Sequence, residues 1–173
     1  PTYGIYAGYE LMENVARPGA EEQIDNEKYQ LKDRRWADFE PGGAREGESL
    51  AGWLTMLNRI RREHPALRRL RNLRFHHVDD ENLLAYSKRA TTEGGDDGTA
   101  DGEDVVLVVA NLDPHGTRES TVRLDMPALG LGWDERVEAT DLVTGAVWDW
   151  GSENYVRLGT DGEPVHVLAL RRY

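Results

Sequence analysis

The sequence predicts an α+β protein in which an irregular N-terminal segment with one amphipathic helix precedes an antiparallel β-sandwich. Apolar residues with helical spacing occupy the region around residue 55, and eight short strand-like segments follow residue 71, separated by turn-forming residues. The chain has 173 residues. At about 150 residues per domain, this length gives one good core plus an appendage and no second complete domain.

Residues 1–11 favour a short strand. Aromatic and β-branched residues surround Gly4 and Gly8, which suits a strand whose backbone is closely approached by its neighbours. No partner strand follows nearby in the sequence. The chain begins at Pro1 within this predicted strand and without a methionine, so we expect it to be a piece of a longer protein.

The segment from Glu13 to Glu48 has neither a two-residue nor a 3.6-residue period, and it is rich in glycine, proline and charge. Irregular stretches of this length in compact proteins are usually functional loops or disordered segments. Its aromatic residues, among them Tyr29, Trp36 and Phe39, argue against disorder. We therefore expect a functional loop.

An amphipathic helix is predicted after Ser49, which is a good N-cap residue. The helix would present an apolar stripe at spacings of three and four, formed by Leu50, Trp53, Leu54, Leu57 and Ile60. His64 precedes Pro65, and a proline disfavours helical geometry at the residue before it. A second short helix is therefore expected over Pro65–Leu70.

Eight segments after Arg71 have the composition of antiparallel strands. They are Leu73–Val78, Leu83–Arg89, Val105–Leu112, Ser120–Leu124, Arg136–Leu142, Ala146–Trp150, Tyr155–Leu158 and Val165–Arg171. Val105–Ala110 is apolar without alternation, which predicts the most buried strand. Asp79–Asn82 and Asp113–Gly116 predict tight turns. Thr91–Asp104 has four glycines, six acids and no basic residue, which predicts a flexible insertion in a hairpin.

The composition excludes several classes of function. Lysine and arginine total 21 against 32 aspartates and glutamates, so the net charge is −11 and nucleic acid is not expected as a partner. The absence of cysteine excludes disulfides, thiolate catalysis and Cys-based metal sites. The histidines lack i, i+4 spacing, so we expect no metal site. No apolar run approaches the roughly 18 residues of a membrane span.

Two groups of residues outside the loop could bind a partner. Residues 59–74 contain seven arginines and one glutamate, which could form a nucleic-acid patch. The acidic chain instead favours arginines on a solvated helix face that pair with acids. Trp148 and Trp150 share one strand face, and exposed aromatic rings stack on sugars, but packing within a small sandwich is the favoured interpretation.

The loop residues 21–29 carry the most informative side chains, because a run of acids precedes Lys28 and Tyr29. Sugar hydroxyls need many donors and acceptors beside an aromatic wall, and this composition can supply both. Judged on these residues alone, a solvated acidic run is the favoured alternative. Paired glycosidase carboxylates need a defined separation, so no acid here is assigned as catalytic.

The order of these pieces resembles the α-amylase superfamily (glycoside hydrolase family 13). Ile5–Leu11 is similar to the Ile-Tyr-Tyr-Gly-Asp-Glu-Ile stretch at its eighth barrel strand. Leu57–Leu67 resembles its eighth barrel helix, which commonly ends in His-Pro-Ala-Leu, and a sandwich called domain C follows there. The longer string of Pro1–Tyr6, Gly8–Leu11, Glu13–Val15 and Glu27–Tyr29 is similar to the bacterial alpha-1,4-glucan:maltose-1-phosphate maltosyltransferases.

This resemblance implies that residues 1–71 are the last strand, donor-site loop and last helix of a (β/α)8 barrel, and that residues 72–173 are domain C. It implies a retaining enzyme that moves maltosyl units from maltose 1-phosphate to the non-reducing end of an α-1,4-glucan. The family's Lys-Tyr pair, matching Lys28 and Tyr29, contributes to the maltosyl donor site. The family's catalytic carboxylates lie on earlier barrel strands, so none is expected in this chain.

The resemblance further implies a cytoplasmic protein whose partners are maltose 1-phosphate, the glucan and the upstream barrel, with no cofactor; the full-length enzyme could form a homodimer. Two alternatives stay open. One is another amylase-superfamily enzyme, a glucan hydrolase or a trehalose synthase-like isomerase. The other is a glucan-binding or structural sandwich module, which would have no use for the barrel-like strand at residues 4–6 and the loop that contains Lys28 and Tyr29.

Overall fold

The computed structural model describes residues 4–24, 31–91, 102–159 and 161–173. The chain divides into two compact units, Thr2–Arg59 and Ile60–Tyr173. The longest helix, α1 (Ala51–Glu63), contains the boundary between them. Within the described ranges, no helix combines the length and the apolar character needed to cross a membrane.

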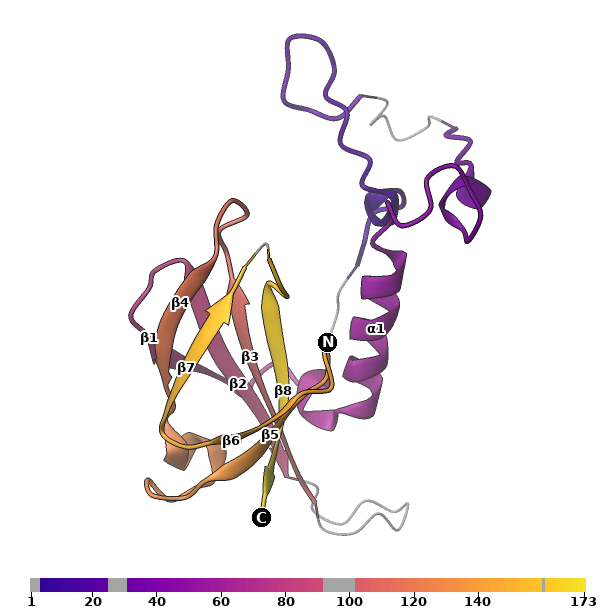
Figure 1. Cartoon of the computed structure of the whole chain (residues 1–173). Coiled ribbons are helices and arrows are strands. Elements are labelled where there is room, and N and C mark those ends of the chain that lie inside the picture. Colours follow the sequence, from indigo (N-terminus) through magenta and orange to yellow (C-terminus); the bar gives the residue numbers. More distant parts are fainter. Residues whose placement is uncertain (1–3, 25–30, 92–101, 160) are drawn as a thin grey trace. The chain divides into compact units, whose positions relative to one another are not determined.

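The larger unit is a mostly β structure of eight antiparallel strands (Figure 1). The strands are β1 (Leu73–Val78), β2 (Leu83–Thr91), β3 (Glu103–Asn111), β4 (Arg118–Arg123), β5 (Val137–Asp141), β6 (Val147–Trp150), β7 (Glu153–Leu158) and β8 (Val165–Arg172). Each strand bound lies within about two residues of its prediction, so the antiparallel sandwich is confirmed. The predicted insertion is shortened by β3, which begins at Glu103; residues 92–101 lie outside the described residues.

The strand order is β6-β5-β8-β3-β2-β1-β4-β7, and β1 joins the two layers. Residues 73–76 of β1 pair with β2, whereas His77 and Val78 pair with β4. Because one strand contributes to both sheets, the layers are connected through a continuous backbone ladder.

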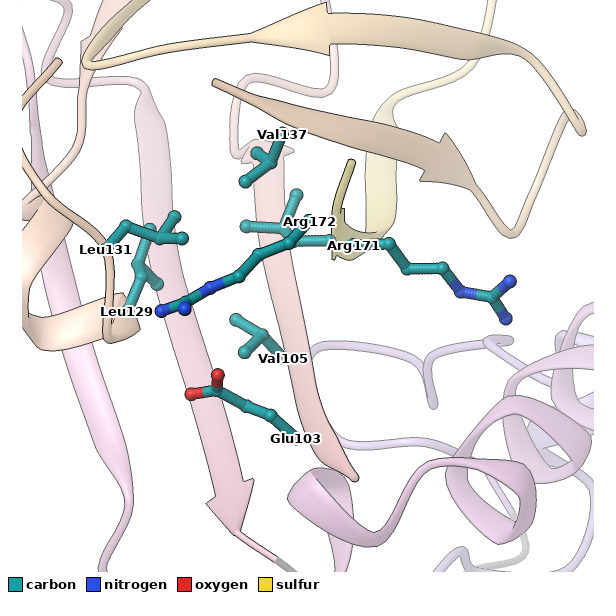
Figure 2. A pocket seen from close by; sticks show the side chains of 8 residues that line it. Glu103, Val105, Leu129, Leu131, Val137, Arg171 and Arg172 are labelled. Carbon is teal, nitrogen blue, oxygen red and sulfur yellow. The ribbon is translucent and has the colours of Figure 1, made fainter. Parts of the chain in front are cut away.

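The core lies between the inward faces of the two layers. Val105, Leu107 and Val109 of β3 point into it. Val106, on the opposite face of the strand, is also fully buried, so β3 is apolar on both sides and shows no alternation, as predicted. Figure 2 shows the end of the core nearest the start of β3, where it opens as a pocket.

A short 3₁₀ helix, η3 (Pro65–Arg68), contacts β2 and β3. It is shorter than the predicted helix over Pro65–Leu70. Asp104 lies on the same face of β3 as Val106. Its carboxylate accepts the Ala66 N–H at 2.8 Å and contacts His64 Nδ1 at 2.7 Å. The strand therefore fixes the turn that follows α1.

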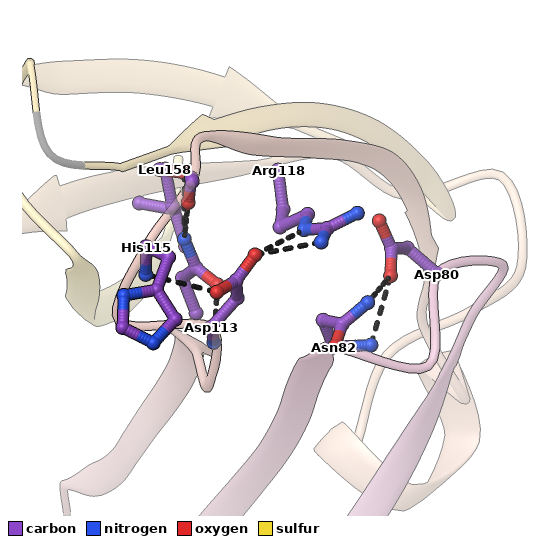
Figure 3. A network of polar contacts seen from close by, with 8 residues as sticks. Asp80, Asn82, Asp113, His115, Arg118 and Leu158 are labelled. Carbon is purple, nitrogen blue, oxygen red and sulfur yellow. Dashed lines mark hydrogen bonds and ion pairs between the residues drawn. The ribbon is translucent and has the colours of Figure 1, made fainter.

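The two predicted tight turns are closed by their own side chains (Figure 3). Asp80 accepts the backbone N–H of Asn82 at 2.8 Å, and Asp113 accepts that of His115 at 2.9 Å. The second oxygen of Asp113 accepts two N–H groups of Arg118 at 2.6 and 2.9 Å. These are Asx-type turns, in which a short acidic side chain replaces a backbone acceptor.

The smaller unit contains two 3₁₀ helices, η1 (Tyr9–Leu11) and η2 (Trp36–Phe39), and most of α1. Ser49 Oγ accepts the Ala51 N–H at 3.1 Å, so the predicted start of the helix is confirmed.

The predicted strand over residues 1–11 is wrong for its described part. Residues 4–6 make no ladder with another described segment, and a turn begins at Ala7. Gly8 has φ 101°, a left-handed conformation that ends any extended run. A strand needs a neighbouring strand to accept and donate its backbone hydrogen bonds, and the described residues provide none there.

Candidate functional site

The functional loop predicted between residues 13 and 48 is anchored at the near end by a small hairpin. Ala16 and Gln23 form an antiparallel bridge, and Ile24 N–H donates to Val15 O at 2.7 Å. An ion pair between Arg17 and Glu22 crosses the same hairpin. Part of the acidic run is therefore paired rather than simply solvated.

The far end of the loop returns to Glu13. Its carboxylate accepts from Lys32 Nζ at 3.0 Å and from Arg34 Nε and Nη2 at 2.8 and 3.1 Å. Arg34 Nη2 also donates to Ala7 O at 2.8 Å. The hydrogen bonds from Arg34 are the largest cause that holds the pKa of Glu13 below its ordinary value, and Lys32 adds to it.

Gly8 is required for this arrangement. Its carbonyl accepts the N–H groups of Leu11 and Glu13 at 3.0 and 3.2 Å, which directs the Glu13 side chain back over the turn. A Cβ at Gly8 would lie 2.3 Å from Glu13 Oε2 and 2.9 Å from Arg34 Nη2. The left-handed backbone conformation favours glycine at this position, and a larger side chain would also displace the Glu13 carboxylate.

A pocket of about 450 Å³ lies within this unit, a volume typical of small-molecule sites. Its lining combines an apolar wall that includes Phe39 with hydrogen-bonding groups that include Asn14 and Gln23. Two arginine side chains of the lining already have partners within the protein: Arg35 pairs with Asp38, and Arg45 stacks over Phe39 at 4.3 Å from the ring centroid. A pocket of this kind suits a neutral polar ligand better than an anion.

Lys28 and Tyr29, the predicted donor-site residues, lie outside the described residues. Their described flanks are both held by one short segment: Ile24 bonds to Val15 and Lys32 to Glu13. The cluster of Glu13, Lys32 and Arg34 was not predicted from the sequence. No spacing rule links residues 19 and 21 positions apart in an irregular segment.

The two tryptophans do not form an exposed pair. Trp150 is 5% exposed and belongs to the core, whereas Trp148 is 37% exposed. The Trp148 ring contacts His166 edge-on, with 5.1 Å between centroids. Packing within the sandwich, the favoured interpretation, is confirmed for Trp150.

The basic stretch between residues 59 and 74 makes contacts within the larger unit. Arg74 pairs with Asp125 at 2.5 Å, and Arg68 donates to the Arg62 carbonyl. The Arg74 contact agrees with the interpretation that these arginines pair with acids, whereas Arg68 bonds to a backbone carbonyl instead. Among the residues that the structure places, no three His, Asp or Glu side chains come together as a metal site.

Comparison with known proteins adds the family. A family model described as "GLGE, C-terminal" matches residues 75–170, which covers β1 to β8 almost completely. The chain belongs to the GlgE C-terminal family.

The chain is also similar to curated proteins along almost its whole length. It is 56% identical to alpha-1,4-glucan:maltose-1-phosphate maltosyltransferase 2 of Streptomyces coelicolor, over 99% of the chain and 24% of that relative. It is 47% identical to alpha-1,4-glucan:maltose-1-phosphate maltosyltransferase of Mycolicibacterium smegmatis, over 98% of the chain and 22% of the relative. The chain thus spans about a quarter of the length of these relatives.

Proposed function

We propose that this chain is the C-terminal part of an alpha-1,4-glucan:maltose-1-phosphate maltosyltransferase. The complete enzyme would transfer maltosyl units from maltose 1-phosphate to the non-reducing end of an α-1,4-glucan, with retention of configuration. The observation that carries this proposal is the 56% identity to a maltosyltransferase over 99% of the chain. The similarity includes the loop before α1, outside the residues that the family model matches.

In this proposal, residues 1–71 complete a catalytic (β/α)8 barrel and residues 72–173 form domain C. Two features of the smaller unit support it. Residues 4–6 lack a ladder partner among the described residues, and a barrel strand receives one from each neighbour. Leu57, in the apolar stripe of α1, is 40% exposed, which suits a helix that covers a barrel.

Lys28 and Tyr29 are proposed to bind the maltosyl group of the donor. An ammonium can donate to several hydroxyls, and a phenol can both stack on a sugar ring and form a hydrogen bond. The anchored flanks support this role, because a binding loop needs fixed ends to hold its side chains in place. The reacting carboxylates would come from the upstream barrel, and no metal or cofactor is required.

The proposed partners are maltose 1-phosphate, the glucan acceptor and the rest of the barrel. A cytoplasmic location and a homodimer of the full-length enzyme belong to the same proposal. Cytoplasmic proteins use few disulfides, and this chain has no cysteine.

Steady-state kinetics of the full-length enzyme with maltose 1-phosphate and a glucan acceptor tests the proposal. Lys28→Ala should lower kcat/KM for the donor by about 5- to 150-fold, because sugar hydroxyls are left unpaired in a partly closed site. Tyr29→Phe keeps the ring and should lose less than Tyr29→Ala. Lys88→Ala, on β2, is the matched control and should leave donor kinetics unchanged.

The products separate the alternatives. A maltosyltransferase extends the glucan and releases phosphate. A hydrolase would release free maltose, and an isomerase would convert free maltose without phosphate. Unchanged donor kinetics in Lys28→Ala would remove this residue from the donor site.

A further inference from the structure

The sandwich contains a pocket of about 310 Å³ that the proposed reaction does not use. It lies at one end of the core, between the first residues of β3 and the last residues of β8 (Figure 2). An engineered apolar cavity of about 150 Å³ is large enough to bind benzene. This pocket therefore has room for a larger apolar group.

The walls of the pocket are aliphatic. They are formed by Val105, Leu129, Leu131, Val137 and Leu170. None of these side chains is more than 7% exposed, so the interior of the pocket is continuous with the core. Binding in such a pocket is favourable for an apolar ligand, because its apolar surface is removed from water.

The pocket is held open by a rigid turn. A short 3₁₀ helix, η4 (Met126–Leu129), is capped by Asp125, whose side chain accepts the Ala128 N–H. Gly130 follows with φ 81°, and Leu131 N–H donates to Met126 O at 2.9 Å. This turn fixes the backbone of the two leucines on the far wall of the pocket.

The mouth of the pocket carries charge. Glu103 forms an ion pair with Arg89. The Arg172 side chain crosses the mouth and donates to the Gly130 carbonyl (Figure 2). Within the described part of the chain, Arg172 forms no ion pair with a carboxylate.

We propose that this pocket binds an aliphatic carboxylate, with its hydrocarbon chain between the apolar walls and its head group on the Arg172 guanidinium. The planar guanidinium matches the two oxygens of a carboxylate. Glu103 lies at the same mouth and would repel a doubly charged phosphate more strongly than a singly charged carboxylate. The proposal does not depend on the transferase function.

Calorimetric titration of the full-length enzyme with octanoate tests the site. Octanoate should bind measurably, and hexanoate should bind about 15-fold more weakly, because each buried methylene changes the affinity roughly fourfold. Octanol tests the requirement for the charge, and inorganic phosphate tests the requirement for the chain. Both should bind at least about tenfold more weakly than octanoate.

Two neighbouring arginines supply matched variants. Arg172→Ala should weaken octanoate binding by about tenfold or more. Arg171 also lines the pocket, but its side chain extends in the opposite direction to that of Arg172 (Figure 2). Arg171→Ala removes the same charge and should change binding less than about twofold. Both residues are exposed, so both variants should fold.

The proposal is overturned if octanoate does not bind, if octanol or phosphate binds as tightly, or if the two arginine variants lose equal affinity. Val137→Phe should fill the pocket. Octanoate binding to this variant, measured on folded protein, is an independent test. Octanoate binding that survives this variant would place the ligand elsewhere.

Discussion

Asp104 Oδ1 lies 2.7 Å from His64 Nδ1, and the other oxygen of the same carboxylate accepts the Ala66 N–H. One side chain on β3 thus satisfies two donors in the turn that follows α1. Burial alone would raise the pKa of Asp104, but the hydrogen bonds from His64 and Ala66 hold it below its ordinary value. The His-Pro-Ala sequence therefore has a structural partner in the sandwich.

Asp104→Ala should lower the free energy of unfolding by about 1–3 kcal/mol, because the partly buried Ala66 N–H loses its acceptor. Asp161→Ala is the control, since its ion pair with Arg157 is exposed and should contribute less than about 1 kcal/mol. Urea denaturation of the two variants measures the difference. Equal losses would contradict a special role for Asp104.

His76 should be neutral in the folded protein down to unusually low pH. It is 8% exposed, its Nδ1 accepts the Asp125 N–H, and its Nε2 lies 2.8 Å from Ser87 Oγ. Burial lowers its pKa from 6.5 to about 4. An NMR titration of the His76 ring should show this midpoint, and a midpoint near the ordinary value would contradict it.

The same shift predicts a pH dependence of stability. Below its ordinary pKa the unfolded state binds a proton that folded His76 does not, so its contribution is complete above about pH 6.5 and is lost as the pH falls toward 4. The total loss is at most about 3 kcal/mol. Denaturation at pH 7.5 and 4.5 measures it, and His76→Gln should reduce the difference between the two pH values.

Glu13→Gln should affect donor binding more than stability in the full-length enzyme. The amide keeps the shape of the side chain but weakens its bonds to Lys32 and Arg34, which anchor the far flank of the proposed donor loop. We expect a several-fold increase in the KM for maltose 1-phosphate and a loss of stability of no more than about 1 kcal/mol. Kinetics and thermal denaturation of one preparation measure both quantities.

Glu48→Gln is the control for this experiment. Glu48 pairs with Arg45 only three positions away and does not bridge the loop. If Glu48→Gln raised the donor KM while Glu13→Gln did not, the anchoring role would be refuted.

Substitution of either tryptophan should lower the stability of the protein without changing its binding of the donor. Trp150→Ala removes a core side chain and should cost about 3–5 kcal/mol, whereas Trp148→Ala loses mainly its edge contact with His166, about 0.5–1.5 kcal/mol. Neither should change the donor KM, provided that the variant is assayed below its Tm. A raised donor KM in Trp148→Ala would indicate that the sandwich takes part in sugar binding.

The sandwich was predictable because its strands carry a local signal. Alternation, β-branched residues and turn-forming acids identify each strand without knowledge of its partner. Asp113, for example, closes its turn with a residue two positions later. The apolar run in β3 was also informative, because burial on both faces removes alternation.

The structure of the N-terminal unit was less predictable, because it depends on contacts between residues that are far apart in the sequence. Glu13 is held by residues 19 and 21 positions later, and no periodicity reports such a pairing. The predicted strand around Gly4 requires neighbouring strands that the described chain does not contain. The assignment of Lys28 and Tyr29 came from family resemblance and stays a prediction.

The position of β8 affects the folding of the sandwich during protein synthesis. β8 lies between β3 and β5 and pairs with both, although it is the last strand in sequence. Until a ribosome has synthesised β8, the hairpin of β5 and β6 has no ladder to the rest of the sheet, and β3 has an unpaired apolar edge. The nascent sandwich therefore remains exposed to aggregation until β8 emerges.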